Sequence, residues 1–248
     1  MTHAGYFEGI GGFSLGAERA GIETIYTCEI DEFRHEWLKY YLPNATHEKD
    51  ITTANGMYAD IFTAGFPCKD ISAANPKGKG LQGARSGLFF DFVQFVRRFR
   101  PQYVVLENSP NVISKRYVLD ILGQLTQIGY NAEWDVIHKK IFGYADERKR
   151  FILVAYRNEI GRNAGNCVFS EKSFESCKQL FRTEVELWNA ISRMDNDKMR
   201  LDAIAQSCAS DTGLSKELVA QEIAAYGDAV CPDVAQLVFE LIKIHAKL

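Results

Sequence analysis

Residues 60–72 read D-I-F-T-A-G-F-P-C-K-D-I-S. The apolar run of residues 61–64 predicts a short buried strand, which ends at a Gly-Phe-Pro turn directly before Cys68. In open α/β sheets, ligands bind outside the carboxyl ends of the strands. This stretch therefore predicts that a cysteine lies at the ligand-binding edge of such a sheet.

A second strand of this kind is predicted at residues 103–108, Y-V-V-L-E-N, where the apolar run stops at Glu107. A thiol and a carboxyl group are thus expected at one sheet edge, an arrangement that suits nucleophilic attack assisted by an acid. Each residue alone has a plainer interpretation, because a lone cysteine is often a small buried residue and a strand-terminal acid often caps a helix.

The composition sets limits on the class of protein. The 248 residues suffice for one large domain, or for one domain with a small appendage, and the net charge of -3 gives no overall basic field for nucleic acid. The cysteines form no C-x-x-C pair, which argues against a zinc module and favours a reducing compartment. No apolar run approaches the roughly 18 residues of a membrane span, and no secretory signal is found. We expect a cytoplasmic protein without a metal or a membrane partner.

A glycine-rich turn follows the first predicted strand, in Y-F-E-G-I-G-G-F at residues 6–13. Glycines let the backbone approach a ligand closely, and the helix that follows favours negative groups at its start. The next strand, residues 23–28, ends at Glu29, the place where nucleotide-binding folds commonly hold ribose hydroxyls. An ordinary tight turn and a surface acid are the alternatives for these two features.

Strand and helix patterns alternate along residues 1–156. Helices are expected at residues 31–42, 88–100 and 117–128, and further strands at 131–137 and 151–156. The aromatic residues of the first of these helices (Phe33, Trp37, Tyr40 and Tyr41) are expected in the core. The alternation predicts a doubly wound, mostly parallel α/β sheet of Rossmann-like class with helices on both faces.

The chain changes character after residue 156. Residues 157–226 predict a small region with helices at 184–193, 198–206 and 216–226. Pro232 then opens a last amphipathic helix with Val234, Leu237, Val238, Leu241 and Ile242 on one side. We predict a catalytic and cofactor-binding domain at residues 1–156, a small recognition or docking region at 157–226, and a C-terminal motif and helix at 227–248 that return to the first domain.

A basic, glycine-rich loop, N-P-K-G-K-G-L-Q-G-A-R-S-G, spans residues 75–87 and carries Lys77, Lys79 and Arg85. A loop of this kind beside a nucleophile is a candidate lid, and its positive charge indicates a phosphate-bearing partner. A plain surface loop is the alternative.

The motifs in order resemble those of the cytosine-C5 DNA methyltransferase family. The resemblance is carried by F-E-G-I-G-G (7–12), E-I-D (29–31), D-I (50–51), G-F-P-C (65–68), E-N (107–108), R-K-R (148–150) and G-D-A-V (227–230). It implies methyl transfer from S-adenosylmethionine to a cytosine that is flipped out of double-stranded DNA.

The resemblance also implies roles for residues. Cys68 would add to the cytosine ring, Glu107 would contact the ring nitrogens, and Arg148 and Arg150 would hold the base carbonyl and a phosphate. The implied cofactor residues are Phe7, Gly9, Ile10, Gly11, Gly12, Glu29, Ile30, Asp50, Ile51, Gly65, Phe66, Pro67, Leu88, Asp228 and Val230. The implied DNA-binding residues are Lys69, Ser72, Lys77, Lys79 and Arg85.

Some positions depart from the family pattern. Lys69 and Asp228 replace the usual Gln and Asn, and Ala145-Asp146 replaces the usual Pro-Gln. The region at residues 157–226 is short and helical, where the family usually carries a larger recognition domain with β structure. A specificity partner therefore stays open, and we expect a monomer or weak dimer of phage, prophage or restriction-modification type.

Three other functions stay open at this point. They are methylation of cytosine in RNA such as tRNA, a catalytically idle DNA-binding or regulatory homologue, and a NAD-binding Rossmann protein. The last of these leaves Cys68 and Glu107 without a role.

Overall fold

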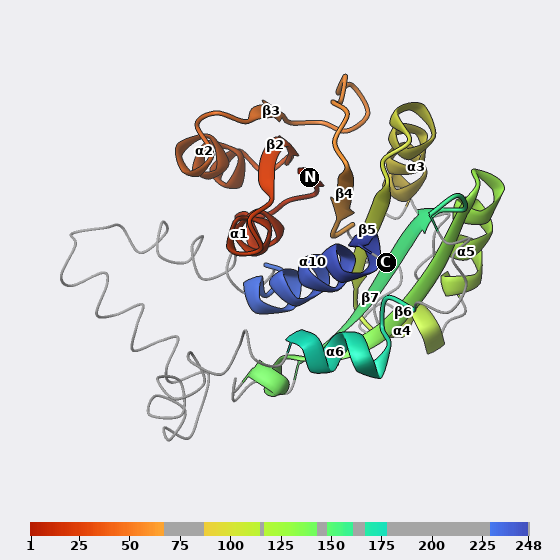
Figure 1. Cartoon of the computed structure of the whole chain (residues 1–248). Helices are drawn as coiled ribbons and strands as arrows, with labels where there is room; N and C mark the ends of the chain where they lie inside the picture. Colours follow the sequence, from red (N-terminus) through yellow and green to blue (C-terminus); the bar gives the residue numbers. More distant parts are fainter. Residues whose placement is uncertain (67–86, 115–116, 143–147, 161–166, 178–228, 248) are drawn as a thin grey trace, which may run out of the picture.

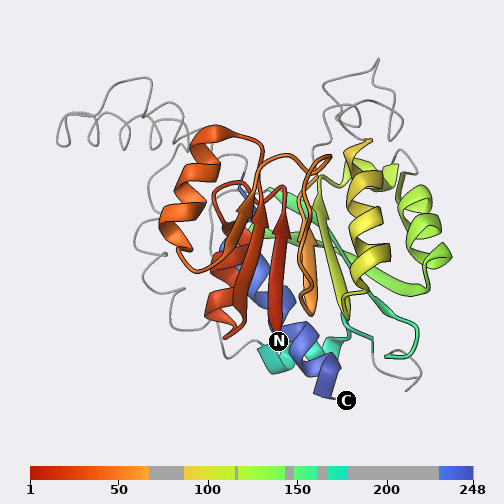
Figure 2. The same cartoon turned by 90° about the horizontal axis from the view of Figure 1, so that it is seen from above.

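The computed structural model describes residues 1–66, 87–114, 117–142, 148–160, 167–177 and 229–247. Within them, a seven-stranded sheet has the order β3-β2-β1-β4-β5-β7-β6 (Figures 1 and 2). Its strands are β1 (Thr2–Tyr6), β2 (Glu23–Cys28), β3 (Thr46–Glu48), β4 (Ile61–Ala64), β5 (Tyr103–Asn108), β6 (Tyr130–His138) and β7 (Lys149–Arg157).

The predicted mostly parallel sheet is confirmed. The pairs β1–β2, β1–β4, β2–β3 and β4–β5 are parallel, whereas β7 runs antiparallel to both β5 and β6. Helix patterns separate most of the parallel strands, but only residues 139–148 join β6 to β7. A connection this short joins antiparallel neighbours, because a parallel crossover needs a dozen or more residues.

Helices cover both faces of the sheet, as predicted (Figure 1). Alternate residues of β5 show the two layers, because Val104 and Leu106 face one apolar core while Tyr103 and Val105 face the other. The first core contains residues of α3 (Leu88–Phe99) and α5 (Tyr117–Gln127), near the short helix α4 (Asn111–Ser114). The second core contains residues of α1 (Gly12–Arg19), α6 (Glu171–Cys177) and α10 (Pro232–Lys247).

The last helix returns to the first, which confirms the apolar side predicted for it. Val234, Leu237, Val238, Leu241 and Ile242 are all buried in the second core. An ion pair also joins the two helices, with Arg19 Nη1 2.8 Å from Asp233 Oδ1. The two ends of the chain thus build one layer, although the division into domains stays a prediction.

The prediction for the aromatic residues of α2 (Glu32–Tyr41) was wrong. Trp37 is 40% exposed and Tyr40 is 81% exposed, while α2 buries His35 and Leu38 instead. The helix lies beside the edge strand β3, so only a narrow stripe of it is covered (Figure 2). The exposed aromatic side chains of α2 can therefore contact a neighbouring loop.

Two further findings bear on the predictions for the rest of the chain. The helices predicted at 184–226 and the basic loop at 75–87 lie outside the described residues, apart from Gly87. No helix in the described part of the chain is long and apolar enough to cross a membrane.

Candidate active site at the carboxyl edge of the sheet

The strand register brings the predicted motifs side by side. Tyr6 of β1 pairs with Cys28 of β2 and with Ala64 of β4, and Ala64 pairs with Leu106 of β5. The residues that follow these positions therefore lie beside one another at one edge of the sheet, where Glu107 is still within β5. They are Phe7, Glu29, Gly65 and Glu107.

The loop after β1 has an unusual backbone. Phe7 has a φ of 54°, and Gly9 and Gly11 have φ values of 65° and 94°. A left-handed conformation is costly for a side chain as bulky as that of phenylalanine, and such strain is found most often at functional sites. The glycines let the chain turn into α1, whose first turn closes with a 2.8 Å hydrogen bond from Leu15 N to Gly11 O.

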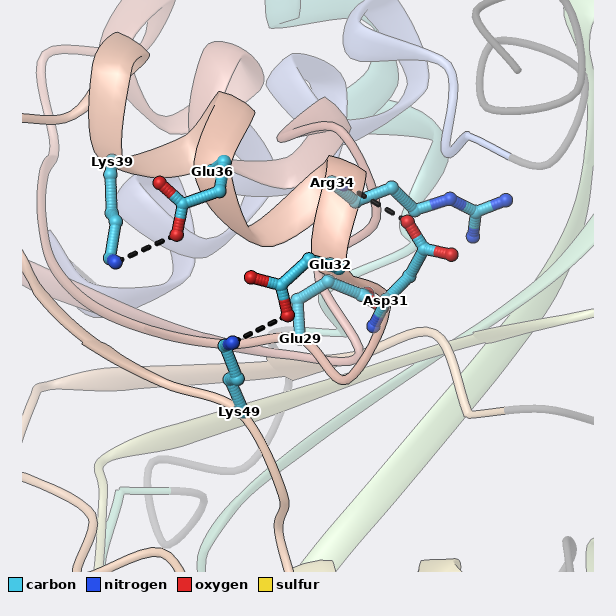
Figure 3. Close-up of polar contacts among 7 residues, drawn as sticks. All are labelled: Glu29, Asp31, Glu32, Arg34, Glu36, Lys39 and Lys49. Atoms are coloured by element: carbon cyan, nitrogen blue, oxygen red, sulfur yellow. Dashed lines mark hydrogen bonds and ion pairs between the residues drawn. The ribbon is translucent and has the colours of Figure 1, made fainter. Parts of the chain in front are cut away.

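Glu29 holds this loop from the neighbouring strand. Its carboxylate is buried and accepts hydrogen bonds from the backbone N–H groups of Gly9 (2.7 Å) and Asp31 (2.9 Å). Asp31 in turn caps α2 by accepting from Arg34 N at 3.0 Å (Figure 3). The predicted acid thus links the glycine loop to the start of α2.

The residues after β3 complete this side of the site. Asp50 caps its own turn, because its Oδ1 accepts from Thr52 N at 2.9 Å and from Thr52 Oγ1 at 2.8 Å, which lowers its pKa. Ile51 is buried, whereas Ile30 is 65% exposed directly beside Glu29. An exposed isoleucine beside a buried carboxylate offers an apolar surface and a hydrogen-bond acceptor to one ligand.

Gly65 marks the point where distant segments meet. A Cβ atom on Gly65 would lie 3.5 Å from Glu107 Oε2, 3.7 Å from the carbonyl oxygen of Phe7 and 3.8 Å from Val230 Cγ2. A Cβ atom on Gly12 would overlap with the carbonyl oxygen of Val230. Val230, from the C-terminal motif, therefore docks on the glycine loop.

A cavity of about 280 Å³ lies beside this contact. It is lined by Ile10, Gly11, Gly12, Leu15, Trp37, Tyr41, Lys139 and residues 229–232. Trp37, which we had expected in the core, donates a hydrogen bond from Nε1 to the carbonyl oxygen of Ile10 at 3.1 Å. Sequence reasoning missed this role, since an aromatic residue on a helix is usually packed inside.

Glu107 and Arg150 form the polar centre of the edge. Arg150 Nε lies 2.6 Å from Glu107 Oε1, and the two side chains are 21% and 13% exposed, respectively. They meet because the antiparallel strand β7 begins at the edge where β5 ends. Burial raises the pKa of Glu107 above its usual range, against the opposing effect of the Arg150 and Arg148 guanidinium groups.

Asn108 fixes the turn that leads to the predicted nucleophile. It is buried, and its Nδ2 donates to the carbonyl oxygen of Phe66 at 3.3 Å, while its Oδ1 accepts from Ser109 N at 2.8 Å. Phe66 packs on Phe89 of α3 with ring centroids 5.2 Å apart. Sequence reasoning did not assign Asn108 a role, although the E-N pair was a visible signal for one.

Other predicted site residues pack on the core or lie outside the described part of the chain. Leu88 begins α3 and packs on the first core. The predicted residues that lie outside the described part of the chain are Pro67, Cys68, Lys69, Ser72, Lys77, Lys79, Arg85 and Asp228. Among the residues that are described, no group of His, Cys, Asp or Glu side chains could hold a metal ion.

The fold and the sequence both match those of known methyltransferases. The chain shares its fold with the Dnmt2 methyltransferase of S. pombe, with a TM-score of 0.53 and 18% identity over 64% of this chain and 51% of that one. The sheet is therefore the Rossmann-like, mostly parallel fold that this methyltransferase also has. The model of the C-5 cytosine-specific DNA methylase family matches residues 1–223, and the chain belongs to this family.

Curated relatives agree with this assignment. The chain is 31% identical to the Type II methyltransferase M.HhaI of Haemophilus parahaemolyticus over 160 residues, which is 62% of this chain and 48% of that protein. It is 35% identical to the Type II methyltransferase M.CviJI of Paramecium bursaria Chlorella virus IL3A over 159 residues, or 62% and 42% of the two chains. The matched part thus spans less than half the length of each of these relatives.

Proposed function

We propose that this protein transfers a methyl group from S-adenosylmethionine to C5 of cytosine in double-stranded DNA, through a covalent adduct of Cys68. The observation that carries the proposal is the Glu107–Arg150 pair, 2.6 Å apart, beside the Gly65–Phe66 turn from which the chain continues to Cys68. Together with a thiol, the acid and the guanidinium are the groups that this proposal needs for addition to a cytosine ring.

The proposed chemistry uses these groups in sequence. The Cys68 thiolate forms a bond to C6 of cytosine, and the electrons of the C5–C6 double bond make C5 nucleophilic. Glu107, whose pKa is raised by burial, donates a proton towards N3 and so favours this addition. Arg150 keeps the Glu107 side chain in place. In this proposal, positive charge from Arg148 and Arg150 favours ionisation of the Cys68 thiol. After methyl transfer, a base removes the C5 proton, the C5–C6 double bond forms again as Cys68 leaves as a thiolate, and N3 returns its proton to Glu107.

The residues at the other end of the edge suit the cofactor. S-adenosylmethionine, when bound, supplies an electrophilic methyl group. The Glu29 carboxylate, already held by two backbone N–H groups, faces ribose hydroxyls in this proposal, and the exposed Ile30 side chain covers one face of the adenine. The glycine loop and Val230 hold the methionine end.

The target cytosine must leave the duplex, because its C6 atom is inaccessible within the stack. We propose that Arg148 and Arg150 hold the flipped base and its phosphate. Closure by the loop at residues 75–87, DNA contacts by Lys69, Ser72, Lys77, Lys79 and Arg85, and recognition by the region at 157–226 stay predictions.

The test is transfer of labelled methyl from S-adenosylmethionine to unmethylated double-stranded DNA, beside a Cys68→Ala control. Label that appears in DNA and is lost in the variant would support both the reaction and the nucleophile. A tRNA acceptor in a parallel arm tests the RNA alternative, and covalent trapping on 5-fluorocytosine DNA tests the idle homologue. Label in neither nucleic acid, despite measurable cofactor binding, would contradict methylation by this chain alone.

A further inference from the structure

The glycine loop contains a buried acid that has no role in the proposed mechanism. Glu8 is 3% exposed, and its Oε1 accepts hydrogen bonds from Ser14 N at 2.8 Å and from Ser14 Oγ at 2.6 Å. Its Oε2 is buried and has no hydrogen-bond partner in the described part of the chain. Burial of an oxygen without a hydrogen-bond partner costs free energy. Another interaction of the Glu8 side chain must therefore offset this cost.

The carboxyl group of Glu8 occupies the space above Gly5. A Cβ atom on Gly5 would overlap with Glu8 Oε2 and lie 2.6 Å from Glu8 Cδ. Gly5 stands inside β1, between β2 and β4, where glycine weakens a strand and commonly marks the close approach of another group. Gly5 and Glu8 are thus coupled, because a side chain at residue 5 and the carboxyl group of Glu8 exclude each other.

Glu8 also replaces a missing helix cap. Gly11 stands at the N-cap of α1 and offers no side-chain acceptor, while Ser14 lies in the first turn, where backbone N–H groups have no partner within the helix. Glu8 supplies the acceptor that a serine or aspartate cap would otherwise provide. Because Glu8 lies between Phe7 and Gly9, this bond ties the loop to the helix.

We propose that Glu8 is a positioning residue for the cofactor, whose carboxyl group fills the space left by Gly5, holds residues 7–11 against α1 and thereby sets the affinity for S-adenosylmethionine. The inference rests on the proposed function of this loop. It assigns Glu8 no contact with the cofactor, since the Glu8 side chain is buried, with one carboxyl oxygen on Ser14 and the other over Gly5.

The test compares wild type with Glu8→Ala, Gly5→Ala and the double variant Gly5→Ala/Glu8→Ala. Binding of S-adenosylhomocysteine is measured by calorimetry. We expect each single variant to weaken binding about tenfold, the size of one lost hydrogen bond to a carboxylate. The double variant should bind no more weakly than Glu8→Ala alone, because the Cβ atom then has nothing to displace.

Two matched variants separate positioning from a loss of folding. Glu8→Gln keeps the volume and an acceptor for Ser14 N, so its affinity should stay within about threefold of wild type. Gly123→Ala, in α5, adds a Cβ atom that meets nothing within 4 Å and should leave binding unchanged. In methyl transfer, Glu8→Ala should raise the KM for S-adenosylmethionine while kcat at saturation changes less than about twofold.

Either of two results would overturn the inference. One is a Glu8→Ala variant that binds S-adenosylhomocysteine as tightly as wild type. The other is a double variant whose loss of binding free energy equals the sum of the losses in the two single variants. A wild-type chain without cofactor binding would contradict the proposed function instead. In that case, the unfolding midpoints of the same proteins test the coupling between Gly5 and Glu8. Changes in midpoint that add in the double variant would overturn this coupling.

Discussion

Two acids at the carboxyl edge, the buried Glu8 and the largely covered Glu107, have different surroundings. Glu107 faces the Arg150 guanidinium at 2.6 Å, whereas Glu8 faces the N–H and hydroxyl groups of Ser14. Burial raises the pKa of both, but only Glu107 lies where a substrate base can reach it in the proposed mechanism. The same residue type thus serves as an acid at one position and as a structural acceptor at the other.

We predict that Glu107→Gln lowers kcat for methyl transfer by about 10²–10⁴-fold, the range typical for loss of a positioned proton donor. The amide can still donate a hydrogen bond, but it cannot pass a proton towards N3 of cytosine. Steady-state kinetics measure the loss, and calorimetry with S-adenosylhomocysteine should give an affinity close to that of wild type. A variant with unchanged kcat would remove Glu107 from the mechanism.

Glu8 makes stability depend on pH. Burial raises its pKa from 4.5 to about 7, and the nearby Glu29 adds to the shift, while the hydrogen bonds from Ser14 oppose it. The folded chain therefore keeps a proton that the unfolded chain releases, so the free energy of unfolding falls as the pH rises from about 4.5 to about 7.

Glu8→Gln should lack this decrease. The difference in the free energy of unfolding, variant minus wild type, is expected to rise by on the order of 3 kcal/mol between pH 5 and pH 8. Urea unfolding at both pH values measures the difference. His3 and Glu107 are present in both proteins, so their contributions to the pH dependence cancel in the comparison. Burial raises the pKa of Tyr41, another titratable neighbour that the Glu8 charge affects, so Tyr41 stays protonated throughout. Parallel pH curves for the two proteins would contradict a buried, proton-retaining Glu8.

At the scale of elements, α2 shows how a helix can serve a site without entering the core. Its buried residues anchor it, and its exposed Trp37 reaches the carbonyl oxygen of Ile10 in the glycine loop. Its N-cap, Asp31, donates its backbone N–H to Glu29. One helix thus holds the loop from two sides.

The contact between α1 and α10 reverses a usual rule for helices. Alanine in place of a mid-helix glycine ordinarily stabilises a helix by about 1 kcal/mol. At Gly16, however, a Cβ atom would lie 2.5 Å from the Cβ atom of Ala235 and 2.7 Å from the backbone nitrogen of Gln236. We predict that Gly16→Ala destabilises the protein by about 1–3 kcal/mol, as overpacking does.

Gly123→Ala is the matched control, since it should be neutral or slightly stabilising in α5. Denaturant unfolding measures the sign of the change in the free energy of unfolding for both variants. If Gly16→Ala were as stable as Gly123→Ala, the two helices would be less closely packed than the structure indicates.

At the scale of the whole molecule, the C-terminal segment closes both the core and the site. Figure 1 shows α10 lying across the sheet beside α1. Its buried residues contribute to the core shared with β4, β5 and β7, and Val230, just before it, docks on Gly12. The site therefore depends on residues at opposite ends of the chain.

A chain that ends at residue 228 should consequently lose cooperative unfolding and bind no S-adenosylhomocysteine. Each large apolar side chain of α10, such as Leu237, contributes about 1.5–3 kcal/mol through burial, and the truncation removes several at once. Circular dichroism during heating and calorimetry test this expectation against the full chain. A cooperative transition within a few degrees of wild type would show that the N-terminal part folds without α10.

The sequence by itself determined most elements and their order along the chain. The strands over Glu23–Cys28, Ile61–Ala64 and Tyr103–Asn108 were predicted at these bounds, because apolar runs bounded by turn residues carry their own signal. Motif order also placed Glu29, Gly65 and Glu107 at one sheet edge, since parallel strands end on the same side. These features depend on local pattern and on the rule for parallel sheets.

Only the tertiary structure decided which side chains meet. It turned β7 antiparallel and so brought Arg150 to Glu107, and it left Trp37 exposed but bonded to Ile10. It also placed the carboxyl group of Glu8 over Gly5. Each of these contacts depends on the path of the backbone through space, because an antiparallel partner, an edge position or a missing Cβ atom acts on its neighbours only after the sheet has formed.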